Sequence, residues 1–152
     1  MMNTIHILLA DDDEDDCNFF TDALANLAMD TSLTIVNDGE QLIQHLVKTS
    51  ANLPHMLFLD LNMPRKNGFE SLVEIKRNPL WKSLPVIIYS TSFDREKASL
   101  IYRTGAHYYI TKPSDFSSLI DVIQRALTRV LENTTQPPQE QFLLTRPKKG
   151  YS

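Results

Sequence analysis

Five short apolar runs alternate along this chain with five segments of helical periodicity. The runs are too short to favour helices, and the segments between them repeat apolar residues every three to four positions. This alternation is typical of an α/β fold in which helices cover both faces of a parallel sheet. The expected strands are residues 4–10, 33–36, 54–60, 84–89 and 107–110.

The expected helices have recognisable starts or stops. Asp38 is suited to begin the second helix, and Ser114 is suited to cap the last one. The third helix should stop at Asn78 because a proline follows, and the fourth should close on Gly105. Strands and helices therefore alternate from residue 4 to about residue 132.

Length and composition favour a single globular domain outside the membrane. The 152 residues are enough to bury a core, and the single cysteine, Cys17, excludes an internal disulfide. A net charge of −4 gives no electrostatic basis for binding nucleic acid or an anionic membrane. No apolar run approaches the ~18 residues of a membrane span, and the N-terminus lacks a secretory-signal pattern. A cytoplasmic location is expected.

Polar side chains suited to phosphoryl chemistry end four of the expected strands. Because the carboxyl ends of parallel strands share one edge of the sheet, these side chains should meet there. Clustered carboxylates repel one another unless a cation lies among them, and Mg²⁺ prefers such oxygen ligands. A carboxylate can also attack phosphorus to form an aspartyl phosphate, whose charge a metal, a lysine and a hydroxyl would neutralise. The residues are Asp11, Asp12, Asp60, Ser90, Thr91 and Lys112.

Each of these residues has a simpler interpretation when it is taken alone. Asp60 would cap the loop after its strand, Ser90 would be a strand-end hydroxyl, and Lys112 would be a solvated surface lysine. The acids of residues 13–16 complement the dipole of the first helix. Their coincidence at four strand ends favours a functional site over these separate explanations.

Four runs of the sequence together resemble the receiver domain of response regulators, the phosphoacceptor module of two-component signalling. The resemblance extends over residues 4–132. It implies a flavodoxin-like, doubly wound α/β fold, with a five-stranded parallel sheet in the order 2-1-3-4-5 and helices on both faces. The runs are ILLADDDEDD, LFLDLNMPRKNG, LPVIIYSTS and GAHYYITKP.

The resemblance also implies a role for each residue of the site. Asp60 would be the phosphoacceptor. Asp11, Asp12 and Asp60 would bind Mg²⁺, with Asp12 as a direct ligand and Asn62 contributing its backbone carbonyl. Lys112 would be the invariant lysine of the site, turned inward by a cis peptide bond to the following proline.

By the same resemblance, phosphorylation would change one face of the protein. The hydroxyl of Ser90 would be drawn to the phosphoryl group, which leaves room for Tyr109 to swing from an exposed to an inward rotamer. The fourth helix, fifth strand and fifth helix would form the changed face, read by a partner protein in trans or by a second copy of the chain. Such a protein catalyses only its own phosphorylation and dephosphorylation.

The implied phosphoryl donor is a sensor histidine kinase or a phosphotransfer protein. The run DDDEDD and the pairing of YITKP with a short tail resemble, more weakly, single-domain receivers that partner phytochrome-type or hybrid histidine kinases. Residues 133–152 are polar and proline-rich, so we expect a tail without a fold of its own that is dispensable for phosphorylation. Its run Phe142-Leu143-Leu144 is the only part expected to dock on the domain or on a neighbour.

Two alternatives remain open at this point. A haloacid-dehalogenase-like phosphatase also forms an aspartyl phosphate, but it needs a second aspartate where this chain has Asn62. A receiver fold kept as a phosphorylation-independent docking module would not need every chemical position filled. A nucleotide-binding enzyme is poorly supported, because neither glycine-rich phosphate-binding motif occurs.

Overall fold

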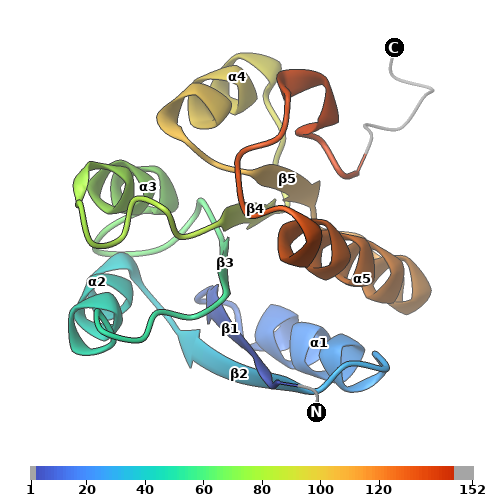
Figure 1. The fold of residues 1–152 in the computed structure, drawn as a ribbon. Coiled ribbons are helices and arrows are strands. Elements are labelled where there is room, and N and C mark those ends of the chain that lie inside the picture. Colours follow the sequence, from blue (N-terminus) through green and yellow to red (C-terminus); the bar gives the residue numbers. More distant parts are fainter. Residues whose placement is uncertain (1–2, 146–152) are drawn as a thin grey trace.

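The computed structural model describes residues 3–145, and within that range five parallel strands form one sheet (Figure 1). The strand order is β2-β1-β3-β4-β5, and every neighbouring pair runs parallel. The expected α/β class and the order 2-1-3-4-5 are therefore confirmed. The strands are β1 (Ile5–Ala10), β2 (Thr31–Val36), β3 (Met56–Leu59), β4 (Val86–Ser90) and β5 (Tyr108–Thr111).

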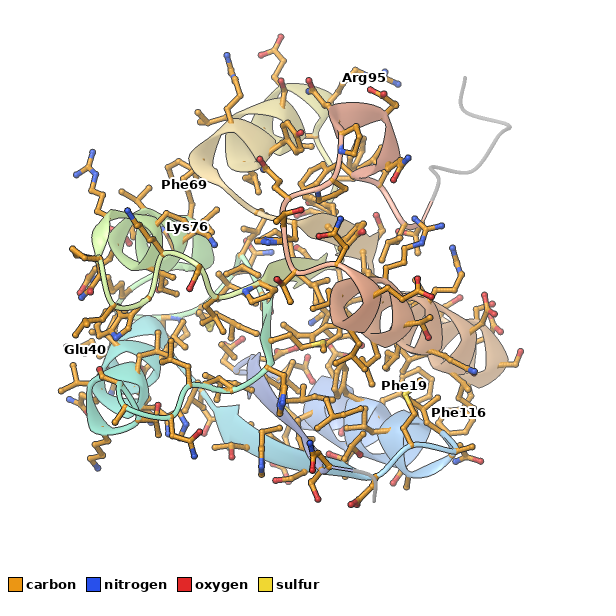
Figure 2. All side chains as sticks on the ribbon, in the orientation of Figure 1. Phe19, Glu40, Phe69, Lys76, Arg95 and Phe116 are labelled. Carbon is orange, nitrogen blue, oxygen red and sulfur yellow. The ribbon has the colours of Figure 1, made fainter. Side chains whose placement is uncertain are left out.

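Helices cover both faces of this sheet. The helices α1 (Glu14–Ala25) and α5 (Phe116–Glu132) pack on one face, where Phe19 and Phe116 lie side by side with ring centroids 5.4 Å apart (Figure 2). The other face is covered by α2 (Gly39–Lys48), α3 (Gly68–Arg77) and α4 (Arg95–Thr104). The two-sided covering explains why the central strand β3 is apolar throughout rather than alternating.

The ends of the helices largely follow the sequence signals. The Asp38 side chain accepts a hydrogen bond from a backbone N–H of α2, and α3 ends at Asn78. Gly105 closes α4 with a φ of 119°, a left-handed conformation that glycine adopts without strain. The expected cap at Ser114 is wrong: Asp115 caps α5, because its carboxylate accepts from the N–H of Ser118.

Two hydrophobic layers fill the space between the sheet and the helices. Ile7 and Leu9 of β1 face α1 and α5, whereas Leu8 and Ala10 face the other helices, as expected for side chains that alternate along a strand. All four residues of β3 are buried. The strand that leads to Asp60 is therefore a rigid support, with both of its faces packed.

The loop after β3 is fixed by close backbone contacts. The N–H of Gly68 donates to the carbonyl of Leu61 at 3.0 Å, and a Cβ on Gly68 would lie 2.2 Å from the Asp60 carbonyl oxygen. The N–H of Gly39 likewise donates to the carbonyl of Lys66 at 3.1 Å. Only a glycine at position 68 allows α3 to begin so close to the end of β3, which holds the chain around Asp60 in place.

Residues 133–145, here called the C-terminal segment, fold back onto the domain. Leu143 bridges to Tyr109 in parallel, and this pairing adds a short piece of chain to the outer edge of β5 (Figure 1). Phe142 and Leu144 are buried, so the expected docking of this run is confirmed. The expectation of a tail without a fold is wrong for residues 133–145, because β5 offers unpaired backbone groups at the sheet edge that the segment satisfies. Residues 146–152 lie outside the described part of the chain.

The rest of the C-terminal segment also binds α4 and the start of β5, so the expectation that only Phe142-Leu143-Leu144 would dock is wrong. The Tyr102 hydroxyl donates to the carbonyl of Pro137 at 2.7 Å, and the Gln136 amide donates to the carbonyls of Tyr102 and Ala106, both at 2.7 Å. A single 3₁₀ turn, Gln139–Gln141, follows before the run that pairs with β5. Among residues 3–145, no helix combines the length and the apolar character needed to cross a membrane.

Candidate phosphoacceptor site

Three carboxylates meet at the carboxyl end of the sheet. Asp11 follows β1 and Asp60 follows β3, and together with Asp12 they place one oxygen each within 4.8 Å of one another. Asp11 and Asp60 are buried, whereas Asp12 is exposed to solvent. The sequence prediction that these acids converge is therefore met. Such a set of oxygen donors, open on one side, suits a divalent cation.

Lys112 places its ammonium group among these acids. Its Nζ lies 2.8 Å from Asp11 Oδ2, 2.8 Å from Asp16 Oδ2 and 3.4 Å from Asp60 Oδ2. It also lies 5.1 Å from the centre of the Tyr89 ring. Burial alone would lower the pKa of Lys112, but the hydrogen bonds to Asp11 and Asp16 raise it above its ordinary value. The lysine is a fixed positive charge at the site.

Asp60 is held in an environment that disfavours its negative charge. Burial raises the pKa of its carboxyl to about 6; the ammonium of Lys112 works in the opposite direction, and the carboxylate of Asp11 raises the pKa further. The N–H of Asn62 donates to Asp60 Oδ1 at 3.2 Å. The negative charge is only partly compensated by the protein, and additional positive charge would stabilise the site. The role of the Asn62 carbonyl as a metal ligand stays a prediction.

Ser90 and Tyr109 lie on the neighbouring strands β4 and β5. Ser90 is fully buried, and its Oγ lies 3.3 Å from Ser92 Oγ and accepts from the Ser92 N–H at 3.4 Å. The Tyr109 ring is buried, and its hydroxyl donates to the carbonyl of Ser92. Burial raises the pKa of the Tyr109 phenol to about 12, and the Asp60 charge raises it too. Thr91, by contrast, is exposed.

The structure differs from the sequence expectations in the rotamer of Tyr109. An exposed ring was expected before phosphorylation, but the ring points inward here. Phe93 and Phe142 pack edge-on against it, with centroids 5.4 and 6.0 Å away. The C-terminal segment therefore helps to hold the inward position.

The expected cis bond between Lys112 and Pro113 is also wrong, since no cis peptide occurs in residues 3–145. The lysine reaches the acids without it. Its N–H donates to the carbonyl of Ser90 at 2.8 Å, which extends the pairing of β5 with β4 by one residue. Because this pairing aims the side chain inward, the chain can turn afterwards through a trans proline into the start of α5.

Sequence reasoning missed Asp16. The acids of residues 13–16 were assigned to the helix dipole, and Asp13 does cap α1. Asp16, however, is bound to Lys112. No sequence signal singled it out, because Asp12 and Asp13 precede the helix and each acid of its first turn, Glu14, Asp15 and Asp16, suits the helix dipole equally well.

The chain belongs to the response regulator receiver domain family, whose model matches residues 7–124. Among individual relatives, the response regulator Rcp1 of Synechocystis is 31% identical over 135 residues, which is 86% of this chain and 92% of Rcp1. Protein PilG of Pseudomonas aeruginosa is 30% identical over 121 residues, which covers 68% of this chain and 87% of PilG.

Solved structures agree with this assignment. The structure of the phosphorylated cyanobacterial phytochrome response regulator RcpA has a TM-score of 0.78 and 31% identity, covering 90% of this chain and all of RcpA (100%). The Mn²⁺-bound form of Rcp1 has a TM-score of 0.75 and 30% identity, covering 88% of this chain and 99% of Rcp1. These relatives are signalling proteins rather than metabolic enzymes, and they give no support to the haloacid-dehalogenase-like alternative.

Proposed function

We propose that this protein is a response regulator that accepts a phosphoryl group on Asp60 and relays the signal to another protein molecule. The observation that carries the proposal is the arrangement around Asp60. A buried carboxylate ends the central strand β3, with the ammonium of Lys112 at 3.4 Å and the carboxylates of Asp11 and Asp12 beside it. This arrangement pairs a nucleophile with the charges that a transferred phosphoryl group requires.

In the proposed reaction, an oxygen of Asp60 attacks the phosphorus of a phosphohistidine on a sensor histidine kinase or phosphotransfer protein. The new O–P bond forms as the P–N bond breaks, and the electron pair of that bond stays on the imidazole nitrogen. Lys112 and the Ser90 hydroxyl donate hydrogen bonds to the phosphoryl oxygens. Asp11, Asp12, Asp60 and the Asn62 carbonyl would hold Mg²⁺, which when bound neutralises negative charge on the phosphoryl group.

The signal is proposed to leave through the face formed by α4, β5 and α5. Movement of Ser90 toward the phosphoryl group, coupled to Tyr109, changes this face, and a partner in trans or a second copy of the chain reads the change. A ligand shifts a two-state equilibrium only by its differential affinity for the two states. The partner must therefore prefer the phosphorylated arrangement of Ser90 and Tyr109.

Labelling by acetyl phosphate tests the proposal. We expect intact-mass analysis to show one Mg²⁺-dependent phosphoryl adduct that Asp60→Ala abolishes and Asp12→Ala severely weakens. Asp22→Asn on α1 is a matched control, because it removes one exposed negative charge outside the acid cluster. An adduct that survives Asp60→Ala would refute the assignment. Turnover of an added phosphomonoester would point to a phosphatase, and no labelling at all would point to a docking module.

A further inference from the structure

The ammonium group of Lys112 is shared unequally among three carboxylates. Asp11 and Asp16 each accept from it at 2.8 Å, whereas the contact to Asp60 is 3.4 Å. An ammonium has three N–H donors, and two of them are engaged at short distance by residues other than the proposed phosphoacceptor. The Lys112 side chain is only 6% exposed, so water does not replace these partners easily.

Within residues 3–145, Lys112 is the one group that hydrogen-bonds to the Asp16 carboxylate. The cap of α1 is Asp13, which accepts from the backbone N–H of Asp16 and leaves the Asp16 carboxylate free to turn toward the lysine. Asp16 is also outside the group of three acids whose oxygens lie within 4.8 Å of one another. The Asp16 side chain is 32% exposed, compared with 0% for Asp11. Of these two short ion pairs of Lys112, the one with Asp16 therefore takes less free energy to break.

We propose that Asp16 is a positioning residue that holds Lys112 back from Asp60 and thereby sets the lifetime of the phosphoryl group. This inference rests on the proposed function of Asp60. A phosphoryl group on Asp60 needs an N–H donor from Lys112, and the Asp16 carboxylate competes for the same donor. Weakening that competition gives the phosphoryl oxygens a larger share of the lysine, which stabilises the phosphorylated state.

The test compares Asp16→Asn with Asp15→Asn. Both changes remove one negative charge from the first turn of α1, but Asp15 is exposed and does not contact Lys112. After labelling with acetyl phosphate and removal of the donor, we expect the adduct of Asp16→Asn to decay about two- to fivefold more slowly than that of Asp15→Asn. This range corresponds to the strength of a partly exposed ion pair.

Two further measurements separate positioning from a general effect of charge or structure. Affinity for Mg²⁺ should change equally in the two variants, because it responds to their common loss of charge. Affinity for beryllofluoride, which mimics the phosphoryl group, should rise about two- to fivefold only in Asp16→Asn. Asp16→Glu, which keeps the carboxylate, should return the lifetime toward that of the unchanged protein.

The outcomes distinguish this inference from the proposed function. If the unchanged protein acquires no adduct on Asp60, the proposed function fails. If it is labelled but the adduct decays at the same rate in Asp16→Asn and Asp15→Asn, only the role of Asp16 is refuted. Should Asp16→Asn fold poorly, Asp16→Glu decides the matter alone: a lifetime unlike that of the unchanged protein, at equal thermal stability, would contradict the inference.

Discussion

At the scale of single residues, His107 joins the sheet to the C-terminal segment. It lies buried just before β5, where its Nδ1 accepts from the N–H of Val86 at 3.4 Å and its Nε2 lies 2.9 Å from the carbonyl of Thr134. These partners fit the neutral ring with its proton on Nε2. Burial lowers the pKa of His107 to about 4, and the nearby ammonium of Lys76 lowers it as well.

This environment predicts a pH-dependent stability. Between pH 6.5 and pH 4 the unfolded chain binds a proton on His107 that the folded protein does not bind. The free energy of unfolding should therefore fall as the pH is lowered through this window, by at most about 1.4 kcal/mol per pH unit from this residue. Urea denaturation at several pH values measures the slope.

The matched comparison for this slope is between two histidine variants. His107→Gln should flatten it, because the titrating ring is gone, and His6→Gln, at an exposed position of β1, is the control that removes a histidine ring without emptying a buried site. An equal slope in the unchanged protein and in His107→Gln would show that other groups cause the pH dependence.

At the scale of elements, the approach of α3 to β3 depends on Gly68. A Cβ at this position would lie 2.2 Å from the Asp60 carbonyl oxygen and 2.7 Å from the Leu61 Cα, and backbone atoms cannot move aside as a flexible side chain can. We expect Gly68→Ala to lower the free energy of unfolding by about 1–3 kcal/mol and to slow labelling of Asp60. Chemical denaturation and the acetyl phosphate assay measure the two effects.

Gly105→Ala is the control for this prediction. Its φ of 119° makes alanine unfavourable by about 1–2 kcal/mol, so the variant loses stability at the end of α4. Labelling of Asp60 should be unaffected in Gly105→Ala. Gly105 lies between α4 and the start of β5, at the edge of the sheet opposite Asp60. Unchanged labelling in Gly68→Ala would contradict the proposed support of the site by the β3–α3 loop.

The C-terminal segment is the second element with a measurable role. Phe142 is 3% exposed and packs against Tyr102 and Tyr109, with ring centroids 5.2 and 6.0 Å away. Phe142→Ala should therefore reduce the free energy of unfolding by about 3–5 kcal/mol. Leu131→Ala, at a position 44% exposed on α5, should have an effect below about 0.5 kcal/mol. Equal effects of the two variants in guanidinium denaturation would argue that the segment does not contribute to the core.

At the scale of the whole molecule, local sequence signals were enough to predict the sheet and most of the acid cluster. The run before Asp60 lies between Pro54 and Pro64 and is wholly apolar near its end, so β3 had few alternatives. Parallel strands then determine that residues at their carboxyl ends meet, which brings Asp11, Asp60 and Lys112 together.

The features that sequence reasoning missed depend on contacts between distant residues. Residues 133–141 are polar and proline-rich, and their attachment depends on Tyr102, Ala106 and His107, which lie about 30 positions earlier in the chain. In the sequence, Asp16 could equally well stabilise the dipole of the first helix or bind a lysine. Only the folded structure shows that it binds Lys112. The rotamer of Tyr109 likewise depends on Phe142, 33 positions along the chain.

The pairing of Leu143 with Tyr109 has a practical consequence for handling the protein. The chain enters β1 at the amino end of the sheet, opposite the acid cluster, whereas the described region ends beside Tyr109. An affinity tag at the N-terminus is therefore remote from the proposed phosphoacceptor. A fusion after Thr145 would instead disturb the C-terminal segment, which packs on Tyr109. Gln139 is exposed and lies in the same segment, so it is a suitable place for a fluorescent dye. The emission of the dye would report when the C-terminal segment detaches from the domain.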